Sequence, residues 1–186
     1  MNLYIKYDIP HTCKKVLQEQ LDKFQLSYAI ISFSEVELKD DISSSMLSQL
    51  TTILNNWGIE IVESHKSILV QKIKDAIVEM VYMEEKLPTS KTSSYLADKL
   101  KHRYGYISNL FSEVTYTSIE NFIILQKIER AKQLLITNEL TITEIAWKLN
   151  YSSVAHLSNQ FKNVTGLTPS MFQRIINRRR SSKEES

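Results

Sequence analysis

The feature that most constrains the fold is an internal repeat in the second half of the chain. Residues 92–122 resemble residues 141–172, at an offset of 49 residues that becomes 50 after a one-residue difference in the middle. The paired positions carry similar side chains, which are Thr92 and Thr141, Ala97 and Ala146, Leu100 and Leu149, Ser108 and Ser158, Asn109 and Asn159, Phe111 and Phe161, and Phe122 and Phe172. Such a repeat predicts two copies of one small structural unit.

The second copy begins with the signals of a short helix. Thr141 followed by Glu144 is a capping-box pattern, which marks a helix start. One face of this helix is apolar and carries Ile145, Ala146 and Leu149. Asn150 is placed to end the helix, because Asn tolerates the left-handed backbone that a tight exit needs.

Two more helices are predicted after this turn. Ser152 can cap the next helix, Gly166 ends it, and Pro169 begins a third helix at a position where its missing N–H costs nothing. Two short helices with a tight turn between them indicate a helix-turn-helix, with residues 153–162 as the recognition helix. The predicted outward face of that helix is small and polar and carries His156, Ser158, Asn159 and Lys162.

This stretch resembles the AraC family of bacterial transcription regulators. The matching residues are Glu144-Ile145-Ala146, Tyr151-Ser152-Ser153, Leu157-Ser158, Phe161-Lys162 and Gly166-x-x-Pro169-x-x-Phe172. Asn150 stands where the family usually has Gly, and Gln173 stands where it usually has Arg. The resemblance implies an all-α domain over residues 88–180, with two helix-turn-helix units joined by a long helix at residues 118–136.

The first copy departs further from the family pattern and is more basic in its turn. Lys101 occupies the usual Gly position, and Arg103 stands where a capping Ser or Thr is usual. Basic and aromatic residues cluster in this stretch, namely Lys99, Lys101, His102, Arg103, Tyr104 and Tyr106. Two interpretations remain open here, a set of phosphate contacts beside the first recognition helix or a solvated basic loop.

The Ser-Asn pairs at equivalent positions of the two copies are the sharpest candidates for base contacts. Asn can make a bidentate contact to adenine, and Ser can serve several bases. The competing explanation is that both residues only keep an exposed helix face polar. The candidate DNA-binding residues are therefore Arg103, Tyr106, Ser108, Asn109, Ser153, His156, Ser158, Asn159 and Lys162.

The first 64 residues predict a separate α+β domain. Their apolar patterns suggest the order β-α-β-β-α-β of a ferredoxin-like fold, with strands at 2–9, 27–33, 36–38 and 59–62 and helices at 11–24 and 43–57. The domain resembles heavy-metal-associated domains in length but lacks their C-x-x-C pair, because only His11 and Cys13 stand at that place. A metal or redox carrier that uses this domain, with the helical domain as a docking module, is the alternative function.

Residues 65–87 predict a linker helix that continues into the second domain. Apolar side chains recur in it at heptad spacing, at Leu69, Ile73, Ala76, Met80, Met83 and Leu87. The pattern fits either a short dimerising helix or one amphipathic helix packed on its neighbour. Residues 181–186 are expected to form a disordered tail.

Charge separates the two predicted domains. Residues 1–64 hold five lysines and no arginine against nine acidic residues, a net charge of −4, whereas residues 88–186 hold fourteen basic against eight acidic residues, a net charge of +6. A basic second domain fits a polyanionic partner, and the acidic first domain fits sensing or interaction instead.

Composition narrows the function further. One Cys excludes an intramolecular disulfide framework, and no apolar run is long enough to span a membrane, so we expect a cytoplasmic protein. Four scattered His and the lack of a Gly-rich phosphate loop give no catalytic or cofactor constellation, so we expect no enzyme, no cofactor and no metal. The expected partners are double-stranded DNA, RNA polymerase or another transcription protein, and an unknown effector or second copy bound through residues 1–64 or the linker helix.

Overall fold

The computed structural model describes residues 3, 5, 9–32, 34–82 and 91–184. The chain divides into two compact units, residues 1–71 and 72–186. The elements are α1 (Ile9–Lys23), β1 (Tyr28–Ile30), β2 (Val36–Leu38), α2 (Ser44–Asn56), α3 (His65–Tyr82), α4 (Thr92–Leu100), α5 (Tyr104–Thr115), α6 (Ile119–Thr137), α7 (Ile142–Lys148), α8 (Val154–Thr165) and α9 (Pro169–Glu184).

The first unit is a pair of helices with a two-stranded hairpin. Strands β1 and β2 pair antiparallel, with Tyr28 opposite Leu38 and Ile30 opposite Val36. The amphipathic helices α1 and α2 bury Leu21, Leu50 and Leu54, and partly buried side chains of the hairpin pack against these three. This small apolar cluster is what holds the unit together.

The ferredoxin-like prediction for residues 1–64 is wrong. The predicted first strand is absent at its described positions, where Leu3 and Ile5 are 73% and 68% exposed, and helix α1 already begins at Ile9. The other positions of that predicted strand, residues 2, 4 and 6–8, lie outside the described residues. The stretch 59–62 is also not a strand, because Ile59 and Ile61 pack on the apolar cluster without pairing with another strand.

Helix α3 buries the apolar stripe that suggested a heptad pattern. Ile73, Ala76 and Met80 are at most 2% exposed within a single chain, so these side chains already pack internally. The next two positions of the predicted pattern, residues 83 and 87, lie outside the described part of the chain. Among the described residues, the pattern is therefore that of an amphipathic packing helix.

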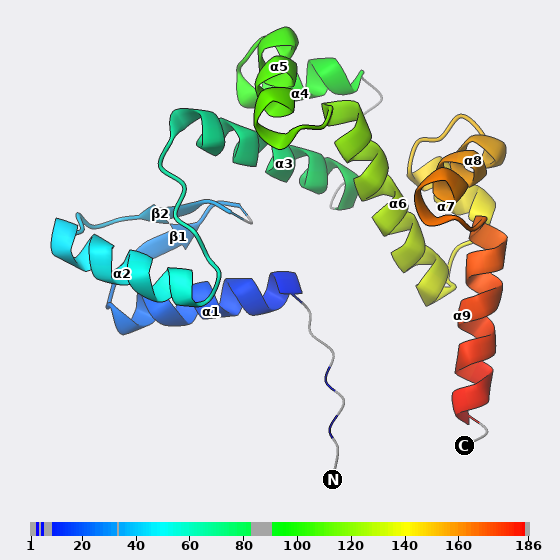
Figure 1. Ribbon diagram of the computed structural model, residues 1–186, viewed down its shortest axis with the longest axis horizontal. Helices are drawn as coiled ribbons and strands as arrows, with labels where there is room; N and C mark the ends of the chain where they lie inside the picture. Colours follow the sequence, from blue (N-terminus) through cyan, green and yellow to red (C-terminus); the bar gives the residue numbers. More distant parts are fainter. Residues whose placement is uncertain (1–2, 4, 6–8, 33, 83–90, 185–186) are drawn as a thin grey trace. The chain divides into compact units, whose positions relative to one another are not determined.

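The second unit confirms the predicted repeat. Helix α6 runs from the pair α4–α5 to the pair α7–α8, and α9 packs against its far end (Figure 1). In each copy a buried Phe meets a second Phe with ring centroids 5.6 Å apart, Phe111 with Phe122 and Phe161 with Phe172. The equivalence therefore extends to individual side-chain contacts.

The second copy also confirms the predicted start and exit of α7, the end of α8 and the start of α9. Thr141 and Glu144 form both halves of the capping box, and Asn150 has a φ of 54° after α7. Gly166 ends α8 with a φ of 78°, and α9 begins at Pro169. Helix α9 continues to Glu184, so residues 181–184 of the predicted tail are helical.

The residues that end α5 and α8 are equivalent, but substituting them should change stability in opposite directions. Tyr116 closes α5 with a φ of 56° and is 94% exposed, whereas Gly166 closes α8 with a φ of 78° and has open space around its Cβ position. We expect Tyr116→Gly to raise the free energy of unfolding by about 0.5–1 kcal/mol and Gly166→Ala to lower it by a similar amount, because left-handed backbone disfavours a Cβ. Urea unfolding followed by circular dichroism measures both, and changes of the same sign would contradict the prediction.

Candidate nucleic-acid interface

Helix α8 presents a row of exposed polar side chains. The hydroxyl of Ser153 caps the helix by accepting the backbone N–H of His156 at 3.1 Å. His156, Asn159 and Lys162 are exposed and three residues apart, so they follow one face of the helix. Ser158 is half-buried and lies beside this row.

Helix α5 presents a similar row with different chemistry. Arg103 stands at the N-cap without a side-chain capping bond and is exposed. Tyr106 is 53% exposed, and Asn109 follows three residues later, also exposed. Ser108 is half-buried. In both copies, the Asn of the predicted Ser-Asn pair is thus the more accessible of the two.

Tyr104 anchors the start of α5 to α6. Its hydroxyl donates a short hydrogen bond to Glu120 Oε1. Burial and then this bond raise the pKa of Tyr104 to about 12, and the same bond is the main reason that the pKa of Glu120 is lowered. This contact holds the start of α5 on α6.

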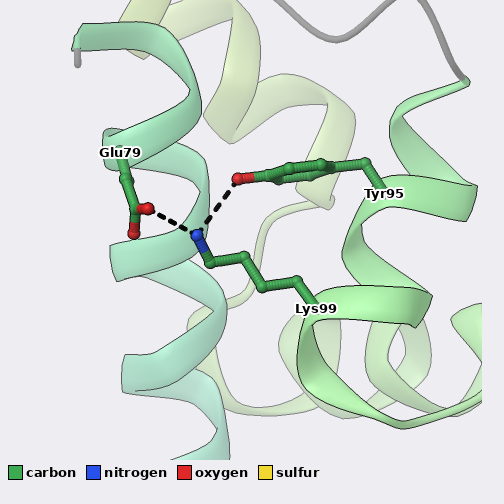
Figure 2. A network of polar contacts seen from close by, with 3 residues as sticks. All are labelled: Glu79, Tyr95 and Lys99. Carbon is green, nitrogen blue, oxygen red and sulfur yellow. Dashed lines mark hydrogen bonds and ion pairs between the residues drawn. The ribbon is translucent and has the colours of Figure 1, made fainter. Parts of the chain in front are cut away.

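The predicted basic cluster of the first copy is only partly accessible to a phosphate. Lys99 Nζ lies 2.6 Å from Glu79 Oε1 and 3.2 Å from Tyr95 Oη, and Figure 2 shows the three side chains together. Lys99 therefore connects α4 to α3 and is already paired. Lys101 and Arg103 are exposed, and Lys101 has a left-handed φ of 57° that ends α4.

The turn of the second copy contains a contact that sequence reasoning missed. Tyr151 is only 8% exposed, and its ring lies 5.1 Å below Lys127 Nζ and 5.2 Å from the His156 ring, edge to face. Burial raises the pKa of Tyr151 to about 12 and lowers the pKa of Lys127. The sequence showed a Tyr-Ser-Ser turn but could not show that Lys127, 24 residues earlier, reaches it.

Ser152 was predicted to cap α8, but the structure gives that role to Ser153. Ser152 Oγ instead lies 3.1 Å from His156 Nδ1. The adjacent serines have different roles because only Ser153, at the N-cap, is placed to accept the backbone N–H of His156. The second hydroxyl is then free to meet the imidazole.

Gln173, which replaces the usual Arg of the resembled family, has a structural partner. Its Nε2 donates to Asn138 Oδ1 at 2.7 Å, and Asn138 ends α6 with a left-handed φ of 59°. The bond ties α9 to the end of α6. Gln173 is therefore engaged within the domain in this structure.

The described residues contain no group of three or more His, Cys, Asp or Glu side chains that could hold a metal ion. His11 and Cys13 both lie in α1, two residues apart, where side chains do not face each other.

Among the described helices, none is long and apolar enough to cross a bilayer.

Comparison with known proteins matches residues 96–175 to a helix-turn-helix domain family. The Msm operon regulatory protein of Streptococcus mutans is 26% identical over 158 residues, covering 72% of this chain and 57% of that protein. The raffinose operon transcriptional regulatory protein RafR of Pediococcus pentosaceus is 24% identical over 149 residues, covering 80% of this chain and 53% of that protein. The chain thus spans little more than half the length of these relatives.

A solved structure shares the fold of the second unit. The C-terminal domain of AraT, a response regulator from Geobacillus stearothermophilus, superposes with a TM-score of 0.52 at 24% identity, covering 60% of this chain and 88% of that one. The matched residues include α5, α6, α7 and α8, which carry both exposed rows. Residues 96–175 of this chain therefore form a helix-turn-helix domain.

Proposed function

We propose that the chain is a sequence-specific regulator of transcription that reads successive major-groove segments of double-stranded DNA. The observation that carries this proposal is the pair of equivalent exposed rows on α5 and α8, joined by one connecting helix. Two such helices on one rigid unit fit groove segments about one DNA turn apart, roughly 34 Å. The relatives named as operon regulators support the same function.

Asn109 and Asn159 are the proposed base-reading residues, and Arg103 and Lys162 are proposed phosphate contacts. Tyr106 and His156 stand at the third helical position of their helices, close to the end that usually meets base edges. Ser153 supports the site as a cap. Ser108 and Ser158 are both half-buried, and we propose that they lie beside the base contacts and contribute less to them than the asparagines.

The proposed partners other than DNA are those that a regulator of transcription would use. RNA polymerase or another transcription protein is the proposed protein partner, and the acidic residues 1–64 are proposed to bind an effector or a second copy. Such a regulator works by binding in the cytoplasm and not by catalysis. The alternative metal or redox carrier has no supporting observation, because the His11 and Cys13 side chains diverge along α1.

Selection of bound duplexes from a random DNA library by the full chain tests the proposal. We expect enrichment of a site with two preferred motifs about ten base pairs apart, because the two recognition helices should occupy successive groove segments. Binding should weaken as salt rises, since phosphate contacts release counterions. Retention of all sequences equally would leave only nonspecific attraction to a basic domain and would contradict specific regulation.

A further inference from the structure

An imidazole and a phenol meet at the start of each recognition helix. In the second copy Tyr151 of the turn contacts His156, and in the first copy His102 of the turn contacts Tyr106 with ring centroids 5.6 Å apart. Tyr106 and His156 both occupy the third helical position, so the two copies exchange the aromatic types between turn and helix. The two helices therefore offer a base edge different hydrogen-bonding atoms at equivalent places.

Two contacts position the imidazole of His156. Its Nδ1 lies 3.1 Å from Ser152 Oγ, and its ring meets the Tyr151 ring at 90°. The backbone N–H of His156 donates to Ser153 Oγ and fixes the start of the helix. Tyr151 is itself fixed, because it is 8% exposed and packs in the buried cluster beneath Lys127. A ring positioned in this way loses little freedom when it binds a ligand.

These contacts leave one atom of the ring for a ligand. Nδ1 is engaged by Ser152, and among the described residues Nε2 has no hydrogen-bond partner. When the Ser152 hydroxyl donates to Nδ1, the neutral ring carries its proton on Nε2. In this tautomer Nε2–H is a donor that is directed away from Ser152.

We infer that His156 reads a guanine through an Nε2–H hydrogen bond, with Ser152 and Tyr151 as positioning residues. The inference rests on the proposed function and names the chemistry of one contact in it. Guanine offers two acceptors in the major groove, N7 and O6, whereas adenine places an amino group beside its N7. A single donor near both atoms therefore favours guanine, while Asn159 on the same face is suited to adenine.

The test uses the duplex that the full chain selects from a random library, and a second duplex with 7-deazaguanine at each guanine in turn. We expect one guanine whose N7 removal weakens wild-type binding about fivefold, the effect of one lost hydrogen bond. His156→Ala should lose about as much on the unmodified duplex and show no further loss at that guanine. His156→Gln, whose amide N–H reaches in a similar direction, should keep part of the preference.

Ser152 variants separate positioning from folding. Ser152→Ala should reduce discrimination at the same guanine and leave the other positions unchanged, and Ser152→Thr should restore it because the hydroxyl returns. Ser170→Ala, which removes an exposed hydroxyl from α9, is the matched control and should change nothing. Circular dichroism of each variant confirms that the fold is retained.

Several outcomes would overturn the inference while DNA binding stands. One is a selected site in which no 7-deazaguanine alters wild-type affinity. Another is a His156→Ala protein that binds all duplexes equally weakly but remains sensitive to the same modified guanine. Preference for adenine or cytosine at that position would assign Nε2 as an acceptor instead. Failure of the full chain to enrich any sequence would contradict the proposed function itself, and this inference with it.

Discussion

Phe161→Ala is expected to lower the free energy of unfolding of the second unit by about 3–5 kcal/mol. Phe161 is fully buried, and its ring meets Phe172 of α9 at a centroid distance of 5.6 Å. It also packs with α6 and α7 residues such as Ile128 and Ile145, so its loss opens a cavity between four helices. Urea unfolding followed by far-ultraviolet circular dichroism measures the change.

The repeat supplies a matched comparison for this prediction. Phe111 is also fully buried and meets Phe122 at the same distance, so Phe111→Ala should cost a similar amount in the first copy. Val164→Ala on the same helix as Phe161 is the control, because Val164 is 41% exposed and should change stability by under about 0.5 kcal/mol. A loss below about 1 kcal/mol for Phe161→Ala would show that the second copy does not depend on this shared core.

The sequence predicted the second unit well because its signals are local and repeated. Capping at Thr141, the left-handed exit at Asn150 and the stop at Gly166 each depend on residues within one helical turn. The buried positions recur in both copies, so each copy supports the interpretation of the other. Agreement between local signals and the packing pattern is what makes a fold predictable.

The first unit was mispredicted because alternation of apolar residues does not by itself make a strand. Leu3 and Ile5 alternate with polar neighbours but remain exposed, and Ile59 and Ile61 alternate but use their side chains to cover a helix pair. A strand needs a neighbour for its backbone hydrogen bonds, and that requirement is not visible in a period of two. Of the predicted strands, the two at 27–33 and 36–38 exist as the paired strands β1 and β2, with β1 shorter than predicted, and these two are adjacent in the chain.

The sequence identified exposed residues of the candidate interface but not the contacts between side chains there. The sequence placed His156, Asn159 and Lys162 on one helix face, and the structure shows all three exposed. It could not show that Lys99 is paired with Glu79, because that partner lies 20 residues away on another helix. Nor could it assign the two serines of the turn, whose roles depend on which one stands at the N-cap.

Asn159→Ala is expected to weaken binding to the selected duplex by about 1–3 kcal/mol and to relax base preference at one position. Asn159 is exposed on the same face as His156, so a bidentate contact to adenine would be lost without a change in the core. Asn109→Ala should have the same kind of effect at bases about ten base pairs away, because α5 should occupy the neighbouring groove segment.

Lys162 provides the contrast that separates base reading from backbone contact. It is exposed one turn beyond Asn159, and as a phosphate contact its replacement by Ala should weaken binding to all sequences and reduce the salt slope by about one unit. Lys99→Ala should leave the slope unchanged, since Lys99 is paired with Glu79. Quantitative binding of the four variants to single-base variants of the duplex distinguishes these effects. A uniform loss for both Asn variants, with no change in preference, would show that these residues only position the backbone or support the fold.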